Sequence, residues 1–304
     1  MRKILSRALL VLLLLGAIPA SACVVRSRAS VPLDVTPRGI FVAVAVNGQP
    51  ASFLLDTDAA RSLVTPEAVR RLGLRLDQWV ASTMVGVGGL DRHSVADPTS
   101  LTLAGIALRR HTLAADNTLA VAVMPFAENG GRRIDGLLGR DFLSAFDVAL
   151  DGPARTMTLY NVAGCDARFR PWSGHSAAIT ALPAYGDALV IPVQVDERPL
   201  RALPDTGAAS SVVVAPGMVR LGLKPGSSGD RVRIHGVGVF VRGAEARRVA
   251  SLRVGDDTTT DPVLLAAPVE VTPIVDMLLG ADWLARRRVW LSYATRQVFV
   301  AAPK

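Results

Sequence analysis

The feature that most constrains this chain is an internal duplication. Residues 53–64 read FLLDTDAARSLV, and residues 202–213 read ALPDTGAASSVV. Aligned without a gap, the two segments share an apolar run, an Asp-Thr pair and then two alanines. Self-similarity of this kind indicates that one structural unit is present twice in the chain.

Three further blocks repeat in the same order. They are LGL at 72–74 and 221–223, GVG at 86–88 and 236–238, and DGLLGRDFL at 135–143 with its counterpart DMLLGADWL at 276–284. Four matched blocks predict two equivalent lobes related by a pseudo-twofold axis. We place the N-terminal lobe at residues 31–161 and the C-terminal lobe at 177–304, joined by a linker at 162–176. The length of 304 residues is enough for two domains with cores of their own.

Each lobe has the pattern of a mostly β fold. Runs rich in Val, Leu and Ala are broken by Gly and Pro, which favours strands over long helices. The expected strands are 39–46, 51–55, 148–150 and 156–160 in the first lobe and 188–195, 198–203, 289–293 and 297–300 in the second. Asn47-Gly48 and Asp196-Glu197 are the expected hairpin turns. Short helices are expected at 66–72, 140–144, 216–221 and 281–286, two of them with Pro near the first turn.

The N-terminus has the order of a secretory signal peptide. Three basic residues, Arg2, Lys3 and Arg7, precede an apolar run at 8–18, and the small residues Ala20-Ser21-Ala22 follow. A retained membrane anchor is the alternative, but the apolar run is short for a bilayer span. We therefore expect residues 1–22 to be removed and the protein to be exported.

The two cysteines leave two alternatives open. Ala20-Ser21-Ala22-Cys23 resembles a bacterial lipobox, which predicts lipidation of Cys23 and a periplasmic protein tethered to the envelope. In that case Cys165 is a free thiol. If ordinary signal peptidase cleaves instead, Cys23 and Cys165 can form a disulfide in an oxidising compartment, and the protein is soluble or secreted.

The charge does not indicate a nucleic-acid partner. The formal net charge is +8, and loss of the three basic residues of the signal segment leaves +5. The basic residues are scattered or in short runs, without an interleaved aromatic stripe. The other common chemistries are also unsupported. His93, His111, His175 and His235 have no paired ligand spacing, and no phosphate-binding Gly-x-x-x-x-Gly-Lys occurs, so we expect neither a metal nor a cofactor.

With its companion blocks in both lobes, the Asp-Thr motif resembles the aspartic peptidases, most closely the retropepsin-like group, here as a single duplicated chain. The resemblance covers nearly all of residues 31–304 and implies two β-barrel lobes of the acid-protease fold. It implies a catalytic dyad of Asp56 and Asp205, with Thr57 and Thr206 bracing the two loops. The residue after each Thr, here Asp58 and Gly207, would donate its backbone N–H to a carboxylate.

The remaining motifs have implied roles as well. The two Leu-Leu-Gly segments, with Gly139 and Gly280, would pass behind the dyad loops, where a close backbone approach favours glycine. The Gly-rich hairpins would be flaps that close over an extended peptide, with Gly86, Gly88, Gly236 and Gly238 at their tips.

Two carboxylates held face to face suit peptide hydrolysis. They cannot both ionise cheaply, so they share a proton, and one acts as base while the other acts as acid. The expected function is an exported, monomeric aspartic endopeptidase acting on peptide or protein substrates. The alternative is a catalytically silent relative that binds peptides or an envelope partner.

Two departures from the family pattern bear on activity. Asp58 occupies a position where the family has Gly, and a carboxylate pointing inward there would raise the pKa values of the dyad. Pro204 precedes Asp205 and offers no N–H, so a missing ladder bond is expected to loosen that loop.

Overall fold

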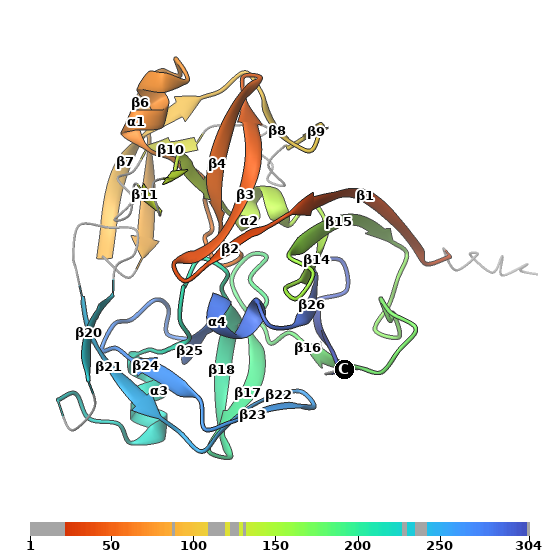
Figure 1. Cartoon of the computed structure of the whole chain (residues 1–304), viewed down its shortest axis with the longest axis vertical. Helices are drawn as coiled ribbons and strands as arrows, with labels where there is room; N and C mark the ends of the chain where they lie inside the picture. The colour runs from red at the N-terminus through yellow and green to blue at the C-terminus, as the bar shows by residue number, and fades with distance from the viewer. Residues whose placement is uncertain are drawn as a thin grey trace, which may run out of the picture.

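The computed structural model describes residues 22–86, 89–108, 119–121, 128–129, 132–226, 230–234 and 242–302. Within these ranges the chain is mostly β and forms two lobes, one above the other in Figure 1, with a sheet shared between them. None of the described helices is long and apolar enough to cross a membrane.

The N-terminal lobe is built on a ten-stranded sheet. Its strands are β2 (Asp34–Thr36), β3 (Gly39–Val46), β4 (Gln49–Leu55), β5 (Leu63–Val64), β6 (Arg75–Gly86), β7 (Gly89–Asp97), β8 (Leu101–Leu103), β9 (Ile106–Ala107), β10 (Leu119–Val121) and β13 (Gly136–Leu138). They lie in the order β6-β7-β10-β5-β13-β4-β3-β8-β9, and β2 pairs with β3. Two short strands, β11 (Glu128–Asn129) and β12 (Arg132–Arg133), pair separately.

The C-terminal lobe repeats this topology. Its nine strands are β17 (Ile191–Val195), β18 (Arg198–Pro204), β19 (Val212–Val213), β20 (Arg231–Ile234), β21 (Arg242–Arg248), β22 (Ser251–Val254), β23 (Asp257–Thr260), β24 (Val263–Ala266) and β25 (Met277–Leu279). Their order, β20-β21-β24-β19-β25-β18-β17-β22-β23, matches that of the first lobe strand for strand. The duplicated sequence therefore folds as a duplicated structure.

A six-stranded sheet joins the lobes. Its strands are β1 (Val24–Pro32), β14 (Asp147–Asp151), β15 (Thr156–Ala163), β16 (Ser176–Thr180), β26 (Arg288–Ser292) and β27 (Gln297–Ala301). Their order is β1-β15-β14-β26-β27-β16, so each lobe contributes a terminal hairpin and one outer strand. At the centre, β14 pairs antiparallel with β26, and the two lobes are therefore joined by backbone hydrogen bonds.

Four short helices follow the matched blocks: α1 (Pro66–Arg71), α2 (Arg140–Leu143), α3 (Ala215–Leu221) and α4 (Ala281–Leu284). Thr65 caps α1, because its side chain accepts a hydrogen bond from the N–H of Ala68. Gly222 ends α3 in the left-handed conformation with φ 70°. The expected helices are confirmed, with ends that differ by one or two residues.

Both predicted hairpin turns are also confirmed. Asn47 and Gly48 have positive φ angles of 51° and 77°, as a two-residue turn between twisted strands requires. Asp196 and Glu197 take the same conformation, with φ of 48° and 62°, although neither is glycine. The side chain of Asp196 accepts a hydrogen bond from the N–H of Ser251 at 2.9 Å, which offsets part of that strain.

The apolar core runs across both lobes. One buried cluster contains Phe53 and Leu138 from the first lobe together with Ile191 and Leu279 from the second. Such a continuous core stabilises the arrangement of the lobes as well as each lobe, because apolar surface from both is removed from water together.

The structure corrects the prediction that Cys23 is lipidated. Cys23 and Cys165 form a disulfide. A cysteine sulfur in a disulfide has no valence left for a thioether to lipid, so the structure has the second of the two alternatives that the sequence left open. The disulfide fastens the start of β1 to the segment that follows β15.

Candidate active site

Asp56 and Asp205 occupy equivalent positions at the ends of β4 and β18. The N–H of Asp56 donates to the carbonyl of Leu138 at 3.0 Å, and the N–H of Asp205 donates to the carbonyl of Leu279 at 2.9 Å. Each aspartate is therefore fixed by the neighbouring strand, β13 or β25, which carries the Leu-Leu-Gly motif.

The threonines that follow the aspartates hold the two loops together. The hydroxyl of Thr57 donates to the carbonyl of Pro204, and that of Thr206 donates to the carbonyl of Leu55, both at 2.7 Å. Each hydroxyl also accepts the backbone N–H of the other threonine, at 3.1 and 3.2 Å. Both threonines are buried. These cross-bonds fix one loop against the other.

Backbone N–H groups also hold each carboxylate. Oδ1 of Asp56 accepts from Asp58 at 3.0 Å and from Ala59 at 2.8 Å. Oδ1 of Asp205 accepts from Gly207 at 2.8 Å and from Ala208 at 3.0 Å. The two carboxylates are thus oriented in the same way by the same two positions of each loop.

The electrostatics of the pair favour a shared proton. Burial raises the pKa of Asp56, while the backbone hydrogen bonds and a hydrogen bond from the Asp205 side chain lower it in part. The pKa of Asp205 is raised well above its usual value by burial and then by the charges of Asp56 and Asp58. Two adjacent carboxylates in a largely buried site cannot both ionise cheaply, so the directions of the two pKa shifts favour one shared proton, with Asp205 as its carrier.

The third loop position differs between the lobes. A Cβ on Gly207 would lie 2.3 Å from Oδ2 of Asp56, so only glycine fits there. The first lobe has Asp58 instead. Its half-buried side chain has a pKa raised to about 7, first by burial and then by the charge of Asp56, against a lowering effect of Arg140. Because Asp58 also raises the pKa of Asp205, its carboxylate has the effect expected of an inward orientation.

Pro204 does not loosen its loop, contrary to the expectation from the sequence. Its carbonyl accepts the Thr57 hydroxyl, and the next residue, Asp205, keeps its bond to Leu279. Pro204 is the last residue of β18, where its missing N–H removes none of the hydrogen bonds that hold the dyad loop.

Gly139 and Gly280 lie close against the backbone of the two aspartate loops. A Cβ on Gly139 would lie 2.7 Å from the carbonyl oxygen of Ala59, and one on Gly280 would lie 2.5 Å from the carbonyl carbon of Ser210. Neither site has room for a side chain, because the obstructing atoms are backbone atoms.

A serine and an aspartate in each lobe complete this support, and the sequence reasoning missed their roles. Ser62 accepts from the N–H of Gly139 at 2.7 Å and donates to Asp141 at 2.6 Å. Ser211 accepts from Gly280 at 3.0 Å and donates to Asp282 at 2.7 Å. The repeat itself contained the signal, since both pairs fall at matched positions of matched blocks.

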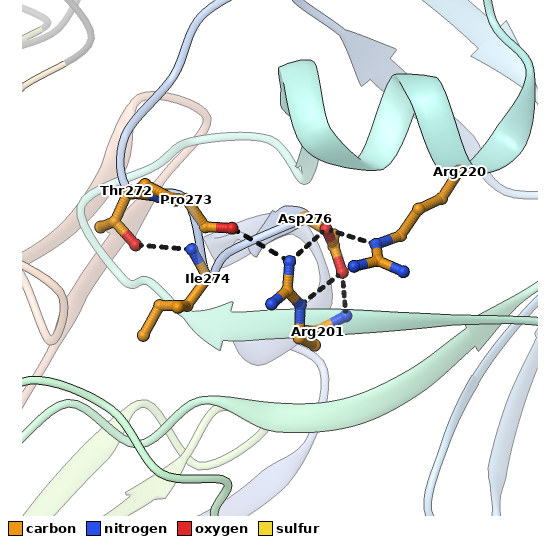
Figure 2. Close-up of polar contacts among 6 residues, drawn as sticks. All are labelled: Arg201, Arg220, Thr272, Pro273, Ile274 and Asp276. Atoms are coloured by element: carbon orange, nitrogen blue, oxygen red, sulfur yellow. Dashed lines mark hydrogen bonds and ion pairs between the residues drawn. The ribbon is translucent and has the colours of Figure 1, made fainter.

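A second missed pair of sites holds the start of each Leu-Leu-Gly strand. In the second lobe the buried carboxylate of Asp276 accepts from the backbone and guanidinium of Arg201, on β18, and from Arg220, on α3 (Figure 2). Burial opposes the charge of Asp276, but the hydrogen bonds from the two arginines outweigh it, so its pKa is lowered. In the first lobe Asp135 pairs with Arg71 at 2.8 Å.

The predicted flap segments form the two hairpins β6–β7 and β20–β21. Gly86 pairs with Gly89 at the end of the first hairpin, and Ile234 pairs with Arg242 in the second. Figure 1 shows the two hairpins on the same side of the molecule, one from each lobe. The other tip residues, Gly88, Gly236 and Gly238, lie outside the described residues.

Comparisons with known proteins agree with this geometry. A family model described as aspartyl protease matches residues 42–142 and 191–283. The chain therefore belongs to the aspartyl protease family, with one match in each lobe. A search of curated proteins finds no match.

Among solved structures, the aspartic proteinase of Irpex lacteus is similar, with a TM-score of 0.55 and 12% identity over 93% of this chain and 98% of that one. At that identity the likeness shows the fold alone. The fold is that of a two-lobed aspartic peptidase.

Proposed function

We propose that this protein is an exported aspartic endopeptidase in which Asp56 and Asp205 activate a water molecule to hydrolyse extended peptides. The observation that carries the proposal is the matched pair of loops: two carboxylates, each held by two N–H groups, joined by reciprocal threonine bonds. Pairs of titratable groups with perturbed pKa values at one buried site are typical of general acid–base catalysis.

The chemistry follows from the shared proton. The ionised carboxylate, assigned to Asp56, takes a proton from water while the resulting hydroxide adds to the peptide carbonyl carbon. The protonated carboxyl, assigned to Asp205, gives its proton to the carbonyl oxygen. Asp56 then gives the proton that it took from water to the peptide nitrogen. The C–N bond breaks as one hydroxyl of the gem-diol re-forms a carbonyl and gives its proton to Asp205, so the dyad again holds one proton.

An extended polypeptide is the substrate class that the hairpins favour. Two flaps, one from each lobe, would bind a peptide backbone as an added strand between them. Both aspartates come from one chain, so a second copy is not needed to complete the site, and a monomer is expected.

The location is proposed from the sequence and the cysteines. The signal-peptide pattern predicts export, and a disulfide is stable in an oxidising compartment such as the bacterial periplasm. Intact mass measurement of the protein isolated from cells tests both points. The expected mass is that of a chain starting close to Cys23, two hydrogens lighter than the reduced form and without a lipid adduct.

A silent peptide-binding protein is the second candidate, because Asp58 adds a carboxylate beside the dyad. The same site would then bind a peptide backbone without an ionisation state suited to hydrolysis.

Cleavage of a diverse peptide library by the oxidised protein, from acid to neutral pH, separates these candidates. Asp56→Asn and Asp205→Asn are the matched controls, because each keeps its shape and loses a titratable group, and pepstatin is an added arm. Cleavage that both substitutions abolish supports the peptidase. Peptide binding without cleavage at any pH, from folded protein, supports the silent relative.

A further inference from the structure

Among the positions where the two lobes differ in charge, two lie together behind and beside the dyad. Asp58 in the first lobe corresponds to Gly207 in the second, and Arg140 corresponds to Ala281. The aspartates, the threonines and the Leu-Leu-Gly strands match between the lobes, and Arg61, which corresponds to Ser210, is a further charge difference on the same loop. The acidic residue Asp58 and the basic residue Arg140 therefore both belong to the first lobe.

The backbone places these two residues as neighbours. The N–H of Arg140 donates to the carbonyl of Ala59 at 2.9 Å, and Ala59 directly follows Asp58. The N–H of Asp58 in turn donates to Oδ1 of Asp56 at 3.0 Å. In the second lobe the corresponding bond joins Ala281 to Ala208 at 2.8 Å, so the loop and the helix start meet in the same way with neutral residues.

The geometry of the second lobe indicates where the Asp58 side chain lies. A Cβ on Gly207 would lie against the Asp56 carboxylate of the opposite lobe. By the pseudo-twofold relation, the side chain at position 58 lies on the side of Asp205. Its effect on the pKa of Asp205 agrees with this placement.

The groups around Asp58 come from three other parts of the fold. Asp205 lies on the loop after β18, Arg140 begins α2, and Tyr293 follows β26; Asp56 lies on the same loop as Asp58. Burial raises the pKa of Tyr293, Arg140 lowers it, and Asp58 is among the carboxylates that raise it. Its phenol is therefore neutral, and the charge of Arg140 lowers the pKa of both Asp56 and Asp58.

We propose that Asp58 acts as a third carboxylate of the dyad, with Arg140 as its counter-charge, and that these two residues set the pH range in which the dyad holds one proton. The inference rests on the proposed function for its effect on hydrolysis. Asp58 is a positioning residue that keeps the proton on Asp205. Arg140 limits the effect of the Asp58 charge on the pKa of Asp56.

The directions of the effects are opposite. Loss of the Asp58 charge removes a repulsion that keeps Asp205 protonated, so the alkaline limb of the pH–rate profile moves to lower pH. Loss of the Arg140 charge removes an attraction that favours ionised Asp56 and Asp58, so the acid limb moves to higher pH. A nearby charge shifts a pKa by roughly 1–3 units in such a site.

The experiment is a double-mutant cycle that restores the residues of the second lobe. Asp58→Gly, Arg140→Ala and the double variant are compared with the natural chain in kcat/KM across the pH range. We expect each single variant to move its limb by about one pH unit. Arg140→Ala should shift the acid limb less in the Asp58→Gly background, because part of the influence of Arg140 acts through the Asp58 carboxylate. Identical limbs in all four proteins, or strictly additive shifts, would overturn the proposal.

A second readout needs no activity. The pKa of Asp58 is raised in the folded protein to about 7, against roughly 3.9 in the unfolded chain. Its contribution to stability is therefore complete below the unfolded value and is lost as pH rises through the folded one. The urea midpoint should fall less between acid and neutral pH in Asp58→Asn, which keeps the shape of the side chain.

This second readout distinguishes the two failures. In one outcome the protein cleaves nothing, while its urea midpoint depends less on pH in Asp58→Asn than in the natural chain. That result disproves the peptidase and supports the charge assignment. An active protein whose pH dependence of stability is unchanged in Asp58→Asn disproves the charge assignment and leaves the peptidase standing.

Discussion

The hydroxyl of Thr206 performs two tasks at a fully buried position. It donates to the carbonyl of Leu55 and accepts the N–H of Thr57, so a single side chain satisfies two backbone groups of the opposite lobe. Unsatisfied buried polar groups are costly, because their hydrogen bonds to water are lost on folding. The threonines therefore keep the two dyad loops in register.

Thr206→Val tests this role, because valine has nearly the same shape and no hydroxyl. We expect a loss of about 1–3 kcal/mol in the free energy of unfolding, since the Leu55 carbonyl and the Thr57 N–H lose their partner. Urea denaturation measures it, and peptide cleavage should fall with it. Thr206→Ser is the control that keeps the hydroxyl and should retain most of the stability. Equal losses in both variants would show that the methyl group, not the hydrogen bonds, matters.

At the scale of elements, the strands β13 and β25 position the dyad from behind. Each is preceded by a buried aspartate, Asp135 or Asp276, and followed by a glycine, Gly139 or Gly280, that packs against the backbone of the dyad loop. Hydrogen bonds at both ends fix the position of the strand, and the strand in turn accepts the N–H of Asp56 or Asp205.

Gly280→Ala should be strongly destabilising, because the new Cβ would lie 2.5 Å from backbone of Ser210. Overpacking of this kind costs about 1–3 kcal/mol. Gly243→Ala is the matched control, since a Cβ there meets nothing within 4 Å. Thermal unfolding of the two variants should differ clearly. Similar melting temperatures would contradict the close packing behind the Asp205 loop.

Arg201→Ser replaces an arginine by the residue found at the equivalent position 52 of the first lobe. Asp276 would keep Arg220 and lose the two guanidinium bonds of Arg201. We expect a loss of about 1–3 kcal/mol at neutral pH, because these bonds are charge-assisted and Asp276 is buried.

The pH dependence gives a second test of the same contact. The lowered pKa of Asp276 contributes stability above the unfolded value, and this contribution is lost as pH falls through the folded value. Arg201→Ser should therefore lose less stability on acidification than the natural chain does. The control Arg231→Ser, which replaces an exposed arginine, should lose as much stability as the natural chain. An equal acid sensitivity in all three proteins would disprove the role of Arg201.

At the scale of the whole molecule, the shared sheet makes the two lobes one unit. The hairpin β14–β15 of the first lobe and the hairpin β26–β27 of the second meet edge to edge, and β1 and β16 close the two sides. The disulfide between Cys23 and Cys165 fixes the outer strand β1, which otherwise pairs only with β15 among the described strands.

Reduction of this disulfide should lower stability. It links cysteines 142 residues apart, and cross-links that close long loops typically contribute about 2–5 kcal/mol. The urea midpoint should fall on addition of a reductant and should be insensitive to it in the Cys23→Ser, Cys165→Ser double variant. A midpoint that reductant leaves unchanged in the natural chain, with the thiols shown to be free, would contradict this prediction.

The sequence alone determined most of the architecture. Repeated blocks with local signals, such as Asn47-Gly48 or the Pro66 helix start, predict elements correctly, because turn and cap preferences depend on a few adjacent residues. The motif also predicts that Asp56 and Asp205 belong together, because a duplication implies symmetry.

Only the tertiary structure decided the rest. The effect of Asp58 on the pKa of Asp205, the tolerance of Pro204, the arginine contacts of Asp276 and the pairing of Cys23 with Cys165 all depend on residues far apart in the chain. Distances, burial and charge between such residues arise only when the lobes pack, so no local pattern contains them.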